Sequence, residues 1–253
     1  MINNSKEKFE KLLKDYDKKF EGWDFKYLSK TGRVQEFPLR WNYYNEIKDY
    51  CINSKCMLDM GTGGGEFLSS LSFLPKKTYA TERYGPNIKI ARERLNTLGI
   101  KVYAPDDKYN LPIESDKFDL VINRHSSYVM SEVKRILKNK GYFITQQVGG
   151  FNCIDLNIML GANNNKVVDW NLTKAINEVV EHNFRIIKVK EDEVKTRFYD
   201  IGAIVYYLKA IPWQVDKFSV EKYYHQLYIL HNYLEEHDYI DFKCHRFFMI
   251  TQK

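Results

Sequence analysis

Apolar and polar residues along the middle of the chain follow a pattern typical of alternating strands and helices. Short apolar runs predict strands at residues 56–60, 77–81, 100–104, 118–123 and 141–148. Helical periodicity occupies the intervals between them, at residues 66–73, 87–98 and 129–137. Strands that alternate with helices predict parallel βαβ units, with helices on both faces of one sheet.

The two flanks follow other patterns. Before the first strand, an apolar stripe predicts an amphipathic helix that contains Phe9, Leu12, Leu13, Tyr16 and Phe20. A second helix is expected after Pro38, which suits a first-turn position, through Tyr50. Residues 152–166 look irregular, and residues 199–208 fit either a helix or a strand. The remaining segments predict helices at 172–182 and 220–236 and strands at 184–189 and 244–251.

These elements together predict the fold class. We expect an α/β protein built on a Rossmann-like, seven-stranded, mostly parallel sheet with helices on both faces. The closing strand at residues 244–251 is expected to run antiparallel to the others. The chain has no evident linker or internal repeat, so we expect one domain with insertions.

A glycine-rich turn follows the first strand of the alternating region. Gly61, Gly63 and Gly65 precede Glu66, where the next helical segment begins. Glycine allows the positive φ angles and the close backbone approach that a ligand-binding turn requires. Nicotinamide-binding folds place a further glycine where Glu66 stands, and an acid there would repel a pyrophosphate. The turn therefore favours a ligand without a pyrophosphate.

Acidic residues stand near the ends of the first three strands. Asp59 precedes the turn, where its carboxylate can accept hydrogen bonds from a cationic amino group. Glu82 ends the second strand, roughly 20 residues after Gly61, a position where an acid accepts hydrogen bonds from ribose hydroxyls. Asp107 follows the third strand and can accept from an adenine amine. Asp106 is the alternative, and either residue can instead cap a turn.

As a set, these motifs resemble the class I methyltransferases, which bind S-adenosylmethionine (SAM). Residues 58–65, Leu-Asp-Met-Gly-Thr-Gly-Gly-Gly, are similar to motif I. Glu82 matches the acid that ends the second strand, and Asp107 matches the acid before Leu-Pro in the type called methyltransferase domain 11. Residues 118–123 resemble the fourth-strand motif, and residues 137–143 resemble the turn before the fifth strand. The resemblance covers about residues 55–148 and implies no substrate.

The resemblance implies SAM as cofactor and S-adenosylhomocysteine as product. The residues expected to bind the cofactor are Asp59, Gly61, Thr62, Gly63, Gly65, Glu82, Arg83, Asp106, Asp107, Lys108, Asn123 and Arg124. Arg124 and His125 follow the fourth strand, where strand ends of an open sheet face the ligand, and they are the candidate catalytic residues. His125 is either a general base or a structural histidine. Arg124 either binds an acidic substrate or pairs with a nearby carboxylate.

The same reasoning gives an expected domain organisation. Residues 1–54 are expected to form a helical segment that packs on the core and closes the cofactor site. Residues 55–253 are expected to form the SAM-binding domain with C-terminal cap insertions. Arg40 is either a surface arginine or a partner of the SAM carboxylate. The candidate aromatic residues for an acceptor pocket are Tyr199, Tyr206, Tyr207, Trp213, Tyr223 and Tyr224.

Charge narrows the class of acceptor. The 253-residue chain carries a net charge of +6, but its Lys and Arg residues are scattered among Asp and Glu. A small-molecule acceptor is therefore favoured over an RNA or protein acceptor, which is the second hypothesis. The third hypothesis is a SAM-binding protein without catalysis, and the fourth is a nicotinamide dehydrogenase. The sequence makes no prediction about the oligomeric state.

The cysteines and the apolar runs bear on metals and location. The four cysteines, Cys51, Cys56, Cys153 and Cys244, form no CxxC motif, and no His stands beside them at metal-ligand spacing. We therefore expect no metal site and no disulfide framework. No apolar run approaches the ~18 residues of a membrane span, and residues 1–10 lack an apolar signal region. The expected compartment is the cytoplasm, with no membrane partner.

Overall fold

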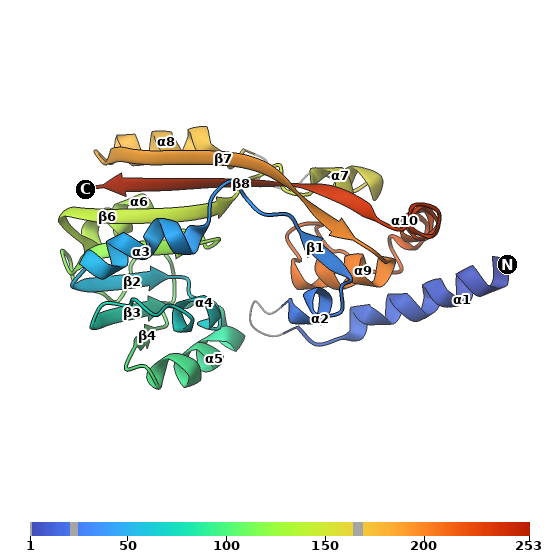
Figure 1. The fold of residues 1–253 in the computed structure, drawn as a ribbon, viewed down its shortest axis with the longest axis horizontal. Helices are drawn as coiled ribbons and strands as arrows, with labels where there is room; N and C mark the ends of the chain where they lie inside the picture. The colour runs from blue at the N-terminus through green and yellow to red at the C-terminus, as the bar shows by residue number, and fades with distance from the viewer. Residues whose placement is uncertain (1, 21–24, 164–168) are drawn as a thin grey trace.

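A mixed sheet runs through the whole molecule, as the computed structural model shows for residues 2–20, 25–163 and 169–253 (Figure 1). In this described part of the chain the sheet has eight strands in the order β1-β7-β8-β6-β5-β2-β3-β4. The strands are β1 (Val34–Glu36), β2 (Cys56–Met60), β3 (Lys77–Thr81), β4 (Lys101–Tyr103), β5 (Phe118–Arg124), β6 (Leu137–Val148), β7 (Arg185–Phe198) and β8 (Ile240–Gln252).

Strand directions confirm the Rossmann-like arrangement. Strands β2 to β6 pair in parallel, and the last strand, β8, lies between β6 and β7 and runs antiparallel to both. The predicted number of seven strands was wrong, because the described residues include an eighth. Strand β1 of the N-terminal segment pairs antiparallel with the outer edge of β7, from Val34 opposite Phe198 to Glu36 opposite Thr196.

The helices follow the predicted alternation with several differences. They are α1 (Ile2–Leu13), η1 (Lys14–Asp17), α2 (Lys26–Ser29), α3 (Tyr43–Asn53), α4 (Glu66–Ser69), α5 (Gly85–Asn96), α6 (Met130–Ile136), α7 (Ile154–Met159), α8 (Leu172–Glu181), α9 (Ile201–Ala210) and α10 (Tyr224–His237). Pro38 does not start a helix. Helix α3 begins five residues later, where the Asn42 side chain accepts from the backbone N–H of Asn45 at 3.1 Å. No helix in the described ranges is long and apolar enough to cross a bilayer.

Two ambiguous segments resolve into helices. Residues 201–210 are helical because Asp200 caps them, its carboxylate accepting from the N–H of Ala203 at 2.9 Å. The helix is buried on nearly every side, which explains why its sequence shows no clear amphipathic period. Residues 154–159, predicted irregular, form the short helix α7, and residues 164–166 of that predicted segment lie outside the described residues.

Strands β7 and β8 are much longer than their apolar runs predicted. They pair with each other from Arg185 opposite Gln252 to Phe198 opposite Ile240. The pairing of β8 with β6 ends at Arg246 opposite Val148, so both long strands continue past the parallel sheet. Charged residues occupy much of β7, which hid the strand pattern from a hydrophobicity count.

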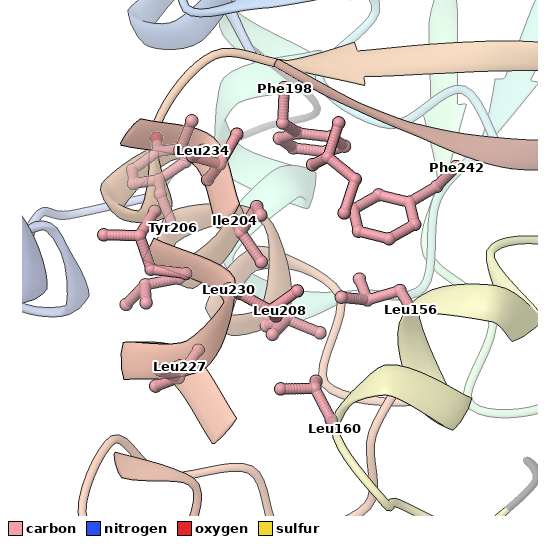
Figure 2. Packing of buried hydrophobic residues seen from close by; sticks show 14 of the residues in the cluster. Leu156, Leu160, Phe198, Ile204, Tyr206, Leu208, Leu227, Leu230, Leu234 and Phe242 are labelled. Atoms are coloured by element: carbon pink, nitrogen blue, oxygen red, sulfur yellow. The ribbon is translucent and has the colours of Figure 1, made fainter. Parts of the chain in front are cut away.

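The extended ends of β7 and β8 carry a second hydrophobic core, which we call the helical lobe. Helices α7, α9 and α10 pack there around the two strand ends (Figure 2). The labelled side chains of this core are Leu156, Leu160, Phe198, Ile204, Tyr206, Leu208, Leu227, Leu230, Leu234 and Phe242. The N-terminal segment divides between the cores: Phe9 of α1 is buried in the lobe, whereas Ile47 of α3 is buried against the parallel sheet. A broad space remains between the lobe and the parallel strand ends.

Candidate functional site

The glycine-rich turn lies where β2 ends. Gly61, Gly63 and Gly65 all have positive φ, at 77°, 64° and 78°. A Cβ atom on Gly61 would collide with the side chain of Ser126, which follows β5, so two strand ends meet at this glycine. The backbone N–H of Thr62 donates to the carbonyl of Thr81 at 2.8 Å, which joins the turn to the end of β3. The turn is therefore a fixed backbone cradle.

Glu82 anchors the turn through backbone hydrogen bonds. Its carboxylate accepts from the N–H of Gly63 at 2.7 Å, of Arg83 at 2.7 Å and of Tyr84 at 2.6 Å. A carboxylate has about four acceptor positions, and one on Oε2 stays available for a ligand. Glu82 also lines a small pocket beside the turn, together with Gly61, Arg83, Asp107 and Lys108. The acid thus holds the cradle and faces the adjoining space at once.

Asp59 supplies a buried acid beneath the turn. Its side chain is 4% exposed. Burial raises the pKa of Asp59 to about 6, and the charge of Glu82 adds to this while that of Arg124 opposes it. Burial and the charge of Asp59 hold the pKa of the Tyr43 phenol well above the usual range, which indicates that Tyr43 of α3 lies near Asp59. Sequence reasoning missed Tyr43, which carries no motif.

The predicted cofactor residues gather around two connected spaces. Beyond the small pocket, a large cavity of about 1690 Å³ opens between the parallel strand ends and the helical lobe. Lys108 and Gly61 border both spaces. The remaining predicted residues that line the large cavity are Asp59, Thr62, Arg124 and His125.

Four other predicted residues line neither space. Gly63 is engaged by Glu82, and a Cβ atom on Gly65 would collide with Leu95 of α5. Asn123 is fully buried: its Nδ2 donates to the carbonyl of Met60 at 2.9 Å, and its Oδ1 accepts from Thr145 and Gln147. The fourth is Asp106, which is exposed. Gly63, Gly65 and Asn123 thus hold the strand ends and the turn in place.

Asp107 closes a local turn and also borders the small pocket. Its Oδ1 accepts from the N–H groups of Tyr109 at 2.7 Å and Asn110 at 2.9 Å, so it closes a local turn. It also lines the small pocket. Asp107 rather than Asp106 is therefore the acid that faces the ligand space.

A chain of three side chains sets the state of His125. The indole N–H of Trp41 donates to Gln146 Oε1 at 2.8 Å, and an indole nitrogen can only donate. The Gln146 amide nitrogen consequently faces His125 Nε2, at 2.8 Å, and donates to it. Nε2 is therefore an acceptor, and the proton of the neutral ring sits on Nδ1.

Electrostatics agree with a neutral His125. His125 is exposed to the large cavity, but the surrounding protein desolvates the ring and thereby holds its pKa well below the usual range. The charges of Arg246 and Arg124 lower it further. The backbone of His125 has a positive φ of 60°, and its N–H donates to the carbonyl of Gln146 at 2.8 Å. Trp41 and Gln146 thus fix both the tautomer and the orientation of this ring.

Comparison with known proteins agrees with this geometry. Residues 58–145 match the profile of the family described as methyltransferase domain. This part of the chain is therefore similar to a methyltransferase domain, and the solved structures below show that the chain shares the fold. No curated protein sequence matches the chain.

Solved structures share the fold of this methyltransferase domain at low sequence identity. BH2331 of Bacillus halodurans C-125, a candidate methyltransferase, is 14% identical over 83% of this chain and 98% of its own, with a TM-score of 0.61. The [4+2]-cyclase SpnF is 12% identical over 83% of this chain and 79% of its own, with a TM-score of 0.54. A candidate sarcosine dimethylglycine methyltransferase from Galdieria sulphuraria is 16% identical over 83% and 82%, with a TM-score of 0.51. Since one of these is a cyclase, the fold by itself does not determine the reaction.

The segment before α3 forms one wall of the large cavity. Residues 36–43 all border this space. Arg40 is already engaged there: its backbone N–H and its Nε bind the Asp192 carboxylate at 2.9 and 3.0 Å. Residues of β7 therefore hold the Arg40 guanidinium, whereas the sequence alone allows a bond to the SAM carboxylate.

The opposite wall of the large cavity comes from the helical lobe. Of the candidate aromatic residues, Tyr207 and Trp213 line the cavity. Tyr206 and Tyr223 are buried in the lobe core, Tyr224 packs against it, and Tyr199 is exposed. Half of these six aromatic residues therefore belong to the packing of the lobe core, in line with the tendency of large aromatic side chains to be buried.

Two cysteines meet in this wall, which the sequence did not predict. The thiols of Cys153 and Cys244 lie 3.6 Å apart, and both are free. Thr196 Oγ1 lies 3.1 Å from the Cys244 thiol, and the Tyr207 hydroxyl lies 3.6 Å from that of Cys153. The hydrogen bond to Cys244 and burial raise the pKa of Cys153. The two positions are too far apart in sequence for a spacing motif to reveal them.

Proposed function

We propose that this protein is a SAM-dependent methyltransferase that acts on a small-molecule acceptor held in the large cavity. The observation that carries the proposal is the rigid glycine cradle flanked by Asp59 and Glu82, which opens directly into that cavity. A cavity of about 1690 Å³ exceeds the roughly 300–1,000 Å³ of a typical ligand pocket, which leaves room for an acceptor beside the cofactor.

The residues of the cradle fit SAM. Glu82 keeps an acceptor position for a ribose hydroxyl, and Asp107 faces the small pocket, where an adenine amine would lie. The Asp59 carboxylate suits a cationic amino group, whose charge would stabilise the ionised acid. SAM, when bound, supplies a methyl group that is already activated for transfer. The protein has then mainly to hold the acceptor in line with it and to exclude water.

His125 fits a positioning role. Because Gln146 donates to Nε2, the His125 ring offers the N–H of Nδ1 rather than a lone pair to any acceptor beside it. It would act as a general base only after the proton moved between the ring nitrogens. We therefore expect methyl transfer to show no pH transition from His125 in the range where a free histidine titrates.

Calorimetry with SAM and with NAD tests the proposal directly. We expect SAM to bind and NAD to bind weakly or not at all. Glu82→Ala and Gly63→Val should each weaken SAM binding by at least about tenfold, because one removes the anchor of the cradle and the other adds a β-branched side chain at positive φ. Glu93→Ala on the exposed side of α5 is the matched control and should leave the affinity unchanged.

Two results would reject the proposal. Tight NAD binding without SAM binding would identify a different cofactor. Unchanged SAM affinity in a folded Glu82→Ala protein would place the cofactor elsewhere. SAM binding together with no methyl transfer to any metabolite, in a screen with labelled SAM, would instead favour a non-catalytic SAM-binding protein.

A further inference from the structure

Arg246 projects into the large cavity from the middle of β8. Its Cα lies opposite Val148 of β6 on one side and Asp192 of β7 on the other. One guanidinium nitrogen, Nη1, donates to Asn152 Oδ1 and to the carbonyl of His245, the latter at 2.9 Å. No described residue accepts from Nε or Nη2. Three of the five N–H donors of the fork are therefore left for a ligand.

The charge of Arg246 acts on both sides of the cavity. It lowers the pKa of His125 beside the cradle, and it also acts on Tyr207 and on Cys153 in the helical lobe. The guanidinium therefore lies between the two walls. These three neighbours are neutral groups, whereas the hydrogen bond from Cys153 and the charge of Arg246 lower the pKa of a fourth, Cys244, to about 7.

No described acidic side chain forms an ion pair with Arg246. The acids nearest to it in the strand register are already used: Asp192 binds Arg40, and Glu191 binds His245 at 2.8 Å. Glu36, the acid of β1 that lines the same cavity, makes no ion pair with it either. A partly buried guanidinium that has no carboxylate partner among the described residues is costly unless an anion joins it.

A second arginine lines the cavity nearer to the cradle. Arg124 lies 4.8 Å from the centre of the Phe67 ring, and its charge acts on Asp59. Arg124 thus lies on the cofactor side, where it suits the carboxylate of SAM. Arg246, which contacts Asn152 and the lobe, is left for the other ligand of the cavity.

We propose that Arg246, held in place by Asn152, forms an oxyanion-binding subsite for the methyl acceptor, which therefore carries a carboxylate or phosphate group. This inference rests on the proposed function, because it assigns the ligand that shares the cavity with SAM. The planar guanidinium fork matches the oxygen geometry of both anions. Trp41, Tyr207 and Trp213 surround the same space, so the body of the acceptor contacts aromatic side chains. The anion anchors the acceptor, and the reacting atom lies elsewhere on it.

Matched probes test the subsite. Naphthalene-2-carboxylate and 2-naphthyl phosphate carry an oxyanion on a flat ring, and naphthalene-2-carboxamide is the neutral counterpart. Binding is measured by calorimetry with and without saturating SAM. At least one anion should bind the wild-type protein about tenfold or more tightly than the amide. The two anions together identify which oxyanion the subsite prefers.

Three variants assign the preference to Arg246. Arg246→Gln should reduce it to less than about twofold, and Arg246→Lys, which keeps the charge but loses the fork, should retain part of it. Arg92→Gln, on the exposed face of α5, removes the same charge far from the cavity and should leave the preference unchanged. SAM affinity should stay at the wild-type value in all three variants.

Three outcomes overturn the inference. The first is a wild-type protein that binds the amide as tightly as both anions. The second is a folded Arg246→Gln or Arg246→Lys protein that keeps the wild-type preference, and the third is a folded Arg92→Gln protein that loses this preference. The test also separates this inference from the proposed function. A protein that binds SAM but shows no oxyanion preference rejects the subsite alone. A protein that shows the preference without binding SAM rejects the methyltransferase assignment and leaves the subsite standing.

Discussion

The parallel half of the sheet and the helical lobe build the two walls of the same cavity in different ways. In the parallel half, the turn after β2 and the ends of β3 and β5 supply backbone groups and short side chains from neighbouring motifs. In the lobe, contacts join residues from opposite ends of the chain, such as Ser5 and His231. The proposed cofactor cradle is thus built from residues close in sequence, whereas the opposite wall is assembled from residues far apart in sequence.

The difference implies that the two halves can be perturbed separately. The cradle lies against the parallel sheet, whose core is distinct from that of the lobe. Substitutions in the lobe core should therefore change the free energy of unfolding and the affinity for the acceptor more than the affinity for SAM. The following changes test this separation.

The largest effect is expected in the lobe core. Phe242 of β8 is fully buried, with its ring centre 5.7 Å from that of Phe198. Phe242→Ala should lower the free energy of unfolding by about 3–5 kcal/mol, because it leaves a cavity in the core. Urea titration measures the loss. SAM affinity of the folded variant should change by less than about threefold, and a parallel loss of SAM binding would show that the two halves are coupled.

The next effect concerns the junction between the N-terminal segment and the lobe. Asp200 caps α9 and also binds Arg33, which in turn contacts Asp15 at 2.6 Å. Asp200→Ala should lower the free energy of unfolding by about 3 kcal/mol, because it removes the cap and one partner of a largely buried ion pair. Asp200→Asn keeps a capping oxygen and should lose less. Equal losses in both variants would mean that the cap contributes nothing.

Asp59 should give effects of opposite sign on stability and on SAM binding. Its pKa is about 6 in the folded protein, above the value of an unfolded aspartate, so the folded state holds a proton that the unfolded state releases between about pH 4 and 6. The stability of the wild-type protein should therefore fall by roughly 2–3 kcal/mol as the pH rises through this range, and then stay level.

Asp59→Asn removes that cost. The unliganded variant should be more stable than the wild type at pH 8 by about the same amount, and equal to it near pH 4, as measured by urea titration. SAM should bind it more weakly, because the negative charge beneath the cradle is gone. Wild-type SAM affinity should likewise fall below about pH 6, and an affinity independent of pH would argue against Asp59 as a ligand-binding acid.

The smallest effect concerns the chain from Trp41 to His125. Trp41→Phe removes the indole donor to Gln146 and should lower the free energy of unfolding by about 1 kcal/mol. The freed amide can rotate, so His125 should show a mixture of tautomers by nitrogen NMR, whereas the wild type should show the Nδ1–H form alone. A single unchanged tautomer would mean that another contact holds the ring.

The parallel half of the fold could be predicted closely. The expected strands at residues 56–60 and 77–81 match β2 and β3 exactly in extent, and the glycine turn lies between β2 and α4. The acids proposed to bind the cofactor could be found from the sequence because each lies near the end of a strand, and the ends of parallel strands share one edge of the sheet. The sequence alone favoured Asp107 over the adjacent Asp106 but left both open. The structure shows that Asp107 lines the small pocket.

The amino-acid sequence alone determined the α/β class, the cofactor cradle and the methyltransferase resemblance, because hydrophobic periodicity and the glycine turn act over a few residues. Only the tertiary structure decided the eighth strand, the length of β7 and β8, the state of His125 and the unpaired charge of Arg246. Each of these depends on partners more than twenty residues away or on the charges around a buried group. Such partners leave no local pattern, since they meet only when the sheet and the lobe enclose the cavity between them.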